Sequence, residues 1–397
     1  MKSEWAELPL GKIVDLVIDY RGKTPKKLGG DWSNAGYRAL SAKNIKTGRI
    51  VQADTIRYVD ESLYQKWMKD EVHRGDILIT SEAPFGQILY WDSDEKIVLS
   101  QRLFCIRVNP KYDARFIYYY MTTSVFQGEL AGRSTGTTVI GLRQPELMKC
   151  IIRIPSVENQ HRIASILSSI DAKIDTNQKI NDNLLEQMEA LYRSWFVDYR
   201  PFGGLKPESW KQSDIYALAN IIYGAPFASK QFNTEGVGKP IIRIRDLKEQ
   251  QFATYTTEVH PKGYLLQPGD IVVGMDGEFR PYIWGNDEAW LNQRVCVFVN
   301  KRPSGKAFLY FTIKPLLYAI EQTQVATTVI HIGKKDYDAF KVTLPNDEIL
   351  DKFDELTEPI IKQIVSNCFE NKRLENLRGV LLPKLMSGEI DVSSVRL

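Results

Sequence analysis

The sequence has few of the residues from which metal and redox centres are built. It contains four cysteines and four histidines among 397 residues. No two cysteines form a CxxC pair, and the histidines are too scattered for metal-ligand spacing. We therefore expect no metal site in this chain, and free thiols in a reducing cytoplasm.

Nucleotide-binding and methyltransferase motifs are also missing. The stretch Gly236–Pro240 ends in proline where a phosphate-binding loop needs a hydroxyl for magnesium. No GxGxxG loop follows a predicted strand, and no Pro-Pro pair exists from which an adenine methyltransferase tetrad could be made. The chain is thus expected to be non-catalytic and to hold no cofactor of its own.

Long apolar runs are absent as well. No stretch of 18 apolar residues occurs, and the first residues, MKSEWAELPLGK, contain no apolar signal region. We therefore expect neither a membrane span nor a secretory signal.

What the sequence does contain is an internal repeat. A shift of 190 residues places Thr137–Ile140 on Thr327–Ile330 and Ile154-Pro155 on Leu344-Pro345. The match continues without a gap to Leu191, which falls on Leu381. Because a solenoid repeats every 20 to 50 residues, this period indicates two copies of a whole domain followed by a helix.

The fold class that we predict is α/β (α+β), with two mixed α/β domains and two long helices that pair as an antiparallel coiled coil. The expected segments are 1–155 (first domain), 156–200 (first helix), 201–345 (linker and second domain) and 346–397 (second helix and tail).

The helices are predicted from caps and apolar spacing. Ser156 and Asn346 are good N-caps. Apolar residues then recur in the 4-3 spacing of a coiled-coil seam. Pro359 predicts a kink in the second helix, or a helix start after it.

Polar residues interrupt this seam at matching positions in both copies. Buried asparagines at a seam fix the register, because one alignment alone lets the amides bond each other. The predicted register residues are Asn177, Asn181, Asn367 and Asn371.

Two matched sequence features are predicted as strands in each domain. Gly75-Asp76 and Gly269-Asp270 are turns before apolar strands. The segments Val98–Cys105 and Trp290–Val297 are read as the next matched strands.

Basic charge lies on the globular parts. The formal net charge is only +3, but both helical segments are net negative, so the two domains carry the basic excess. This distribution is typical of DNA-binding domains on a spacer, although a chance imbalance of surface charge is an alternative.

The segment Met275–Arg280 allows three interpretations. Asp276 and Glu278 could hold the magnesium ion of a nuclease, but the usual trailing lysine is missing. The two carboxylates could instead accept from cytosine amino groups, with Arg280 on guanine or phosphate. A surface turn without function is the third reading.

In the residues described above, the chain resembles the specificity subunit of type I restriction-modification systems. The segment Ile154–Ile163 with its run to Trp195-Phe196 is similar to the central spacer of that family. Leu377–Ile390 is similar to its C-terminal spacer. The paired Gly-Asp-Ile turns and Gln-Arg segments are similar to its target-recognition domains.

The resemblance implies a function. Each recognition domain would read one half of a bipartite, asymmetric site in double-stranded DNA, and the helices would set the gap. Two modification subunits would bring S-adenosylmethionine for N6-methylation of adenine, and restriction subunits would bring ATP and Mg-dependent translocation and cleavage. The alternatives are a self-sufficient nuclease and a coiled-coil scaffold with no DNA role.

Side-chain chemistry predicts which residues contact DNA. Forked and amide side chains read bases, whereas cationic and hydroxyl side chains bind phosphates. The candidates in the first domain are Arg21, Lys23, Thr24, Lys43, Asn44, Gln101, Arg102, Arg133, Thr137 and Thr138. Those in the second are Lys230, Arg243, Arg245, Asp276, Glu278, Arg280, Gln293, Arg294, Thr327 and Thr328. Since Gln-Arg and Thr-Thr recur, a shared role in phosphate contact or in the fold is expected for them.

Overall fold

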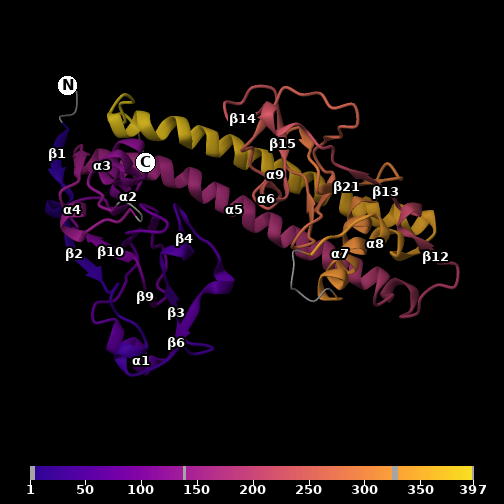
Figure 1. The fold of residues 1–397 in the computed structure, drawn as a ribbon, viewed down its shortest axis with the longest axis horizontal. Coiled ribbons are helices and arrows are strands. Elements are labelled where there is room, and N and C mark those ends of the chain that lie inside the picture. Colours follow the sequence, from indigo (N-terminus) through magenta and orange to yellow (C-terminus); the bar gives the residue numbers. More distant parts are fainter. Residues whose placement is uncertain (1–4, 137–139, 324–329, 396–397) are drawn as a thin grey trace. The chain divides into compact units, whose positions relative to one another are not determined.

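The chain folds into two compact units, each containing part of both long helices. The computed structural model describes residues 5–136, 140–323 and 330–395. The first unit comprises Met1–Ala172 and Glu375–Leu397, and the second comprises Lys173–Leu374. Figure 1 shows the two long helices that contribute to both units, α5 in magenta and α9 in yellow. The predicted segment boundaries kept each helix whole, whereas the contacts divide each helix between the units.

The first unit contains two main sheets and two two-stranded ladders. The four-stranded antiparallel sheet has the order β2 (Val14–Asp19), β10 (Leu103–Val108), β7 (Ile77–Thr80), β8 (Ile88–Tyr90). The three-stranded sheet has the order β6 (Arg57–Val59), β3 (Tyr37–Leu40), β9 (Ile97–Leu99), and β3 runs parallel to β9. The two-stranded pairs are β1 (Ala6–Pro9) with β11 (Ile151–Ile154), and β4 (Ile45–Lys46) with β5 (Arg49–Ile50).

The second unit repeats the four-stranded sheet and has a larger second sheet. Its four-stranded sheet has the order β13 (Ala219–Tyr223), β21 (Val295–Asn300), β18 (Ile271–Gly274), β19 (Pro281–Ile283). Its second sheet has the order β14 (Phe232–Asn233), β16 (Tyr255–Thr256), β15 (Lys239–Ile242), β20 (Ala289–Leu291), β17 (Leu265–Leu266), with β15 parallel to β20. The ladder of β12 (Lys211–Asp214) with β22 (Lys341–Leu344) corresponds to β1 with β11.

Short helices complete each unit. Those of the first are α1 (Glu61–Trp67), α2 (Ala114–Thr122), α3 (Ser124–Gly132) and α4 (Gln144–Met148). Those of the second are α6 (Ile244–Leu247), α7 (Lys306–Thr323) and α8 (Lys334–Asp338). The predicted mixed α/β class is confirmed.

The two predicted Gly-Asp turns lie directly before buried strands. In the first unit, the Asp76 carboxylate is buried and accepts from the His73 backbone N–H at 2.8 Å and from Arg107 Nη2 at 2.8 Å. In the second, Asp270 accepts from the Gln267 backbone N–H at 2.9 Å. The aspartate therefore closes each turn, and β7 or β18 begins at the next residue, as the sequence predicts.

The predicted strands Val98–Cys105 and Trp290–Val297 are wrong as single strands. Each is two strands in different sheets, β9 then β10 and β20 then β21, separated by a turn that contains the Gln-Arg pair. The reason is the backbone at the arginine, where φ is +63° at Arg102 and +70° at Arg294, which ends an extended strand.

The long helices begin where the caps predict. Helix α5 (Val157–Phe196) is capped by Ser156, whose Oγ accepts from the Asn159 backbone N–H at 3.4 Å. Helix α9 (Asp347–Ser387) follows Asn346. A helix start after Pro359 is wrong, because α9 continues through that residue. The solvent-exposed side of the helix tolerates a proline better than a packed side does.

The predicted antiparallel pairing of α5 and α9 is present in each unit. In the second unit, Asn177 Nδ2 donates to Asn371 Oδ1 at 2.8 Å, and Asn367 Nδ2 donates to Asn181 Oδ1 at 2.7 Å. Residue numbers increase from Asn177 to Asn181 along α5, whereas those of their partners decrease from Asn371 to Asn367 along α9. The two helices are therefore antiparallel. In the first unit, Asp171 of α5 forms an ion pair with Arg378 of α9.

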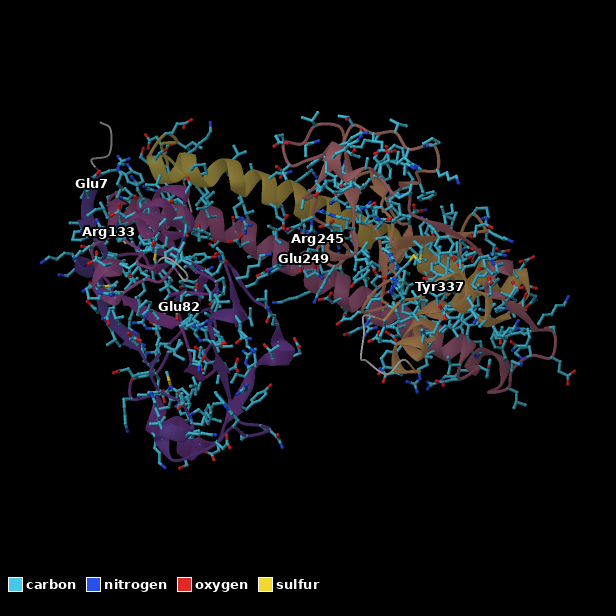
Figure 2. All side chains as sticks on the ribbon, in the orientation of Figure 1. Glu7, Glu82, Arg133, Arg245, Glu249 and Tyr337 are labelled. Carbon is cyan, nitrogen blue, oxygen red and sulfur yellow. The ribbon has the colours of Figure 1, made fainter. Side chains whose placement is uncertain are left out.

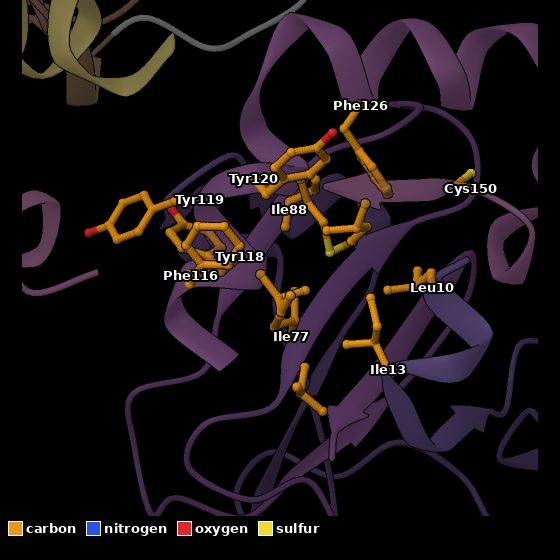
Figure 3. Packing of buried hydrophobic residues seen from close by; sticks show 14 of the residues in the cluster. Leu10, Ile13, Ile77, Ile88, Phe116, Tyr118, Tyr119, Tyr120, Phe126 and Cys150 are labelled. Atoms are coloured by element: carbon orange, nitrogen blue, oxygen red, sulfur yellow. The ribbon is translucent and has the colours of Figure 1, made fainter. Parts of the chain in front are cut away.

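The cores explain why each unit needs both helices. In the first unit, Leu10, Ile77 and Phe116 from the domain pack in one cluster with Leu167 of α5 and Leu385 of α9. Figure 3 shows part of this cluster around Ile77 and Phe116. Complete burial of such a side chain contributes roughly 1.5–3 kcal/mol, so the helix ends are integral to the unit.

The second unit is built in the same way. Met188 and Phe196 of α5 and Phe353 and Ile361 of α9 join the domain residue Phe308 in a single buried cluster. The rings of Phe196 and Phe353 meet edge to face with centroids 4.8 Å apart.

Leucine at all four paired asparagines is expected to maintain or raise the free energy of unfolding while loosening the helix register. Removing both partners leaves no buried amide unsatisfied. Leucine at Asn367 alone should cost about 1–3 kcal/mol, because the buried Asn181 Oδ1 loses its donor. Chemical denaturation measures both effects.

Disulfide crosslinking between cysteines introduced on α5 and α9 measures the register of the same variants. Asn183→Leu, an exposed position of α5, is the control for added apolar surface. If the four-leucine variant crosslinks in one register as sharply as the wild type, the amide pairs do not set the alignment.

Candidate nucleic-acid interface

Each unit places an arginine and a carboxylate at the junction of a strand, a turn and a loop. In the first unit, the Ser81 backbone N–H, just after β7, donates to the carbonyl of Arg102 at 2.9 Å. The Leu142 backbone N–H then donates to the Ser81 carbonyl at 3.0 Å. Arg102 Nε lies 2.9 Å from Glu82 Oε1. We call Glu82 with Arg102 the first acid–arginine turn.

The second unit has the same arrangement. The Met275 backbone N–H donates to the Arg294 carbonyl at 2.8 Å, and the Ile332 backbone N–H donates to the Met275 carbonyl at 3.0 Å. Arg294 Nη1 lies 3.7 Å from Asp276 Oδ1. Asp276 with Arg294 is the second acid–arginine turn. His331, which contacts Arg294 Nη1 through Nδ1 at 3.2 Å, stands where the first unit has Gly141.

The backbone at both arginines is left-handed, as the φ angles given above show. A residue with a Cβ pays roughly 1–2 kcal/mol for this conformation, and glycine adopts it freely. The arginine side chains are 49% and 54% exposed, so they add little to either core. Their surface ion pairs contribute about 0–1 kcal/mol.

The structure brings most of the first-domain candidates together. One surface hollow is lined by Arg21, Thr24, Gln101 and Arg102, among others. A second hollow is lined by Lys43, Asn44, Gln101 and Arg102. Because Gln101 and Arg102 line both hollows, the first acid–arginine turn lies where these candidates meet.

Two first-domain candidates have other tasks. Lys23 Nζ donates to the Trp67 carbonyl and lies 3.7 Å from the centre of the Tyr20 ring. Its burial lowers the pKa of the Lys23 ammonium. Arg133 pairs with Glu129 at 2.7 Å, and Figure 2 shows it labelled in the same unit as Glu82. Neither side chain lines the two hollows.

Arg21 lines the first hollow but is held in place. Its Nε and Nη2 donate to the two oxygens of Asp19, each at 2.8 Å. Its guanidinium carbon lies 3.9 Å from the centre of the Phe104 ring. The side chain therefore presents a fixed, partly neutralised charge at the rim.

Asn44 is a structural residue rather than an exposed contact. It is 1% exposed, accepts from the Ser41 backbone N–H at 3.1 Å, and donates to Thr55 Oγ1 at 3.1 Å. Lys43, one residue earlier, is exposed. The Asn44 amide could bind a base only if these hydrogen bonds broke. Asn44 is therefore not among the DNA-contact residues that we propose.

The second unit repeats this element with different residues. Arg243 to Asp246 follow parallel strand β15 as Ser41 to Asn44 follow β3. The Asp246 carboxylate is buried and accepts from the Arg243 backbone N–H at 3.1 Å. Arg243 also binds Asp246 through its side chain at 3.2 Å and donates to Thr254. Arg243 is thus structural, whereas the exposed Arg245 corresponds to Lys43 (Figure 2).

The three charged side chains of Met275–Arg280 have different surroundings. Arg280 pairs with Glu321 of α7, with Nη2 3.1 Å from Oε1, and this hydrogen bond lowers the pKa of the Glu321 carboxyl. Glu278 is exposed. Asp276 Oδ1 contacts His331 Nδ1 and lies 3.7 Å from Arg294 Nη1, so both side chains engage its carboxylate.

The remaining candidates are exposed or lie outside the described residues. Lys230, Gln101 and Gln293 are exposed. Thr137, Thr138, Thr327 and Thr328 fall in 137–139 and 324–329, which the structure does not describe.

The sequence-based selection missed Glu82. The signal was available, because the Gly-Asp-Ile turns match at a shift of 194 residues and that shift places Glu82 on Asp276. His331 was also missed, as it stands alone in the sequence and gains its arginine neighbour only through the fold.

Two features are absent from the described ranges. No three His, Cys, Asp or Glu side chains there gather closely enough to hold a metal ion. None of the helices described combines the length and the apolar character needed to span a bilayer.

The architecture agrees with a solved structure. The crystal structure of a type I restriction-modification system S subunit from M. genitalium matches with a TM-score of 0.56 at 17% identity, and the match covers 96% of each chain. Two mixed α/β domains with long helices are thus the fold of this class of protein.

The sequence comparisons give the family. The model of the type I restriction modification DNA specificity domain matches residues 2–186 and 207–366. The chain belongs to this family. As a specificity subunit, it is the non-catalytic DNA-recognition component of a type I restriction-modification complex, which confirms the sequence-based interpretation.

Relatives support this assignment along most of the chain. The MjaIX specificity subunit of Methanocaldococcus jannaschii is 24% identical over 81% of this chain and 79% of that protein. The HindI specificity subunit of Haemophilus influenzae is 24% identical over 81% of this chain and 88% of that protein. The EcoBI specificity subunit of Escherichia coli is 37% identical over 35% of this chain.

Arg243→Ala is expected to lower the free energy of unfolding by about 1–3 kcal/mol, because it leaves the buried Asp246 carboxylate without its cation. Arg245→Ala, two residues on, removes an exposed charge and should change stability by less than about 0.5 kcal/mol. Urea denaturation of the full-length variants measures the difference. Equal loss in both variants would contradict the separation into a structural and a surface arginine.

Proposed function

We propose that each domain reads one half of a bipartite, asymmetric site in double-stranded DNA. The observation that carries this proposal is the duplication of one recognition fold, with an acid–arginine turn in each copy. Two copies with different surface residues suit two different half-sites. The predicted segment boundaries at 155, 200 and 345 are retained as proposed limits of the domains and helices.

The paired helices are proposed to set the gap between the half-sites. A helix of about 40 residues spans on the order of 60 Å at 1.5 Å per residue. The amide pairs at Asn177–Asn371 and Asn181–Asn367 support a fixed alignment, since both amides of each pair are satisfied by the other helix.

The DNA-contact residues that we propose are those that are exposed or line the hollows. They comprise Arg21, Thr24, Lys43, Gln101 and Arg102 in the first domain, and Lys230, Arg245, Glu278, Gln293 and Arg294 in the second. The four threonines outside the described residues remain candidates on sequence grounds. Base discrimination is assigned to groups that differ between the copies, because the half-sites differ.

The proposed partners supply the catalysis. Two modification subunits would bind S-adenosylmethionine and methylate adenine N6 after the base leaves the duplex. Restriction subunits would supply ATP-driven translocation and Mg-dependent cleavage. We propose the cytoplasm as the site of action, because the DNA substrate lies there.

Deleting the gene is expected to abolish N6-methyladenine at a single split motif in the host genome. Single-molecule sequencing of methylated DNA from intact and deleted strains measures this loss. A strain that carries the gene back on a plasmid is the control. An unchanged methylation map in a host where the modification subunits copurify with this chain would contradict the proposal.

Glu278→Ala is expected to relax one base position in one half of that motif and to leave the other half unchanged. Loss of a base contact costs about 1–3 kcal/mol at that position. The same methylation map measures the change, and Glu208→Ala removes another exposed carboxylate of the second unit as a control. Relaxation in both halves would contradict the assignment of one half-site to each domain.

A further inference from the structure

An arginine occupies a left-handed turn position in both copies, although glycine suits that backbone better. The φ angles of Arg102 and Arg294 differ by only a few degrees, and both arginines are followed at once by the central strand of a four-stranded sheet. Strained positions of this kind persist when the surrounding structure holds them in place, and they cluster at functional sites. A left-handed arginine occurs in both copies although the surrounding loops differ in length. This recurrence indicates a shared role for the arginine side chain in the two domains.

The fold does not account for the arginine side chain. Each turn is closed by backbone bonds, Ser81 to Arg102 and Met275 to Arg294, which any residue could make. Each guanidinium is half-exposed and pairs with a partly buried carboxylate, and an ion pair with one exposed partner contributes about 0–1 kcal/mol, which does not exceed the cost of the left-handed backbone. Of the two roles expected from the sequence, fold and phosphate contact, the structure therefore favours the second.

The guanidinium has donors left for a second anion. A guanidinium carries five N–H donors in a planar fork. In the first turn, Nε faces Glu82, and the side chain lines the two hollows that also contain Lys43 and Arg21. In the second turn, Nη1 lies 3.7 Å from Asp276 Oδ1 and contacts the His331 ring. Because the two arginine side chains are about half exposed, other N–H donors of each guanidinium remain accessible to a second anion.

We propose that Arg102 and Arg294 are matched contacts to DNA phosphates, one in each recognition domain. This inference rests on the proposed function, because it needs DNA on both domains. An identical group at the same place in both domains cannot distinguish two different half-sites, whereas a phosphate is present at every position of both. The two arginines set the position of each domain on the duplex, and neighbouring residues that differ between the copies read the bases.

The test compares Arg102→Gly, Arg294→Gly and the double variant in the complex of the full chain with its modification subunits. Binding is measured at 50 and 200 mM salt to a duplex with the mapped motif and to a scrambled duplex. The wild-type ratio of affinities at the two salt concentrations should fall about 3.5-fold for each arginine removed, on both duplexes. Thermal unfolding of the full chain should show equal or higher stability, since glycine relieves the left-handed backbone.

Matched controls separate charge, backbone and position. Gln52→Gly changes another left-handed residue, with φ of +50°, without removing a charge. Lys111→Ala and Lys301→Ala remove exposed cations just beyond the far ends of β10 and β21, the strands that the two arginines precede. Arg102→Lys keeps the charge. All four should retain the wild-type salt dependence. If the glycine variant fails to fold, Arg102→Gln removes the charge while keeping a long side chain, and it should show the same fall in salt dependence.

Each of the other outcomes contradicts the phosphate assignment, the proposed function, or both. Weakening on the motif duplex alone, with unchanged salt dependence, would make the arginines base contacts and overturn the phosphate assignment. No change on either duplex would also overturn it. A wild-type complex that binds both duplexes equally and without salt dependence would overturn the proposed function, and the phosphate assignment with it.

Discussion

Two amide pairs in the middle of the long helices determine how the rest of the second unit is assembled. Asn177 bonds Asn371 and Asn181 bonds Asn367, and three of these four side chains are buried. Sliding one helix by a turn would allow at most one amide pair to re-form and would leave the other two amides without their partners, at a cost of about 1–3 kcal/mol for each unsatisfied buried group. The aromatic cluster around Phe196 and Phe353 forms in one alignment of α5 and α9 only.

The same alignment explains how one duplicated sequence gives two complete cores. Each domain packs on the start of its own helix and on the end of the helix from the other copy. In the first unit these are Ile163 and Leu385, and in the second they are Ile361 and Met188. The antiparallel pairing therefore supplies each copy with a segment that its own sequence places far away. Surface loops remain free to differ, which suits a protein whose two domains recognise different sequences.

The repeat, the helices and their pairing could be predicted from sequence because they depend on periodic spacing and on caps. The break at Arg102 could not be predicted, because Val98–Cys105 is apolar on both sides of the turn and a positive φ at arginine leaves no mark in the composition. For the site, residue chemistry found the arginines. It did not distinguish exposed Lys43 from buried Asn44, since burial depends on Thr55, eleven residues away.

The first core has a consequence for how the chain is made. Leu385, Met386 and Val392 are buried in it beside Leu10 and Ile13. A ribosome that adds about 5–20 residues per second needs roughly 12–46 seconds to proceed from residue 155, the end of the first domain, to Leu385. During that interval the first domain has been synthesised but lacks part of its interior. The domain that is synthesised first is therefore completed only after the C-terminal part of α9 has been made.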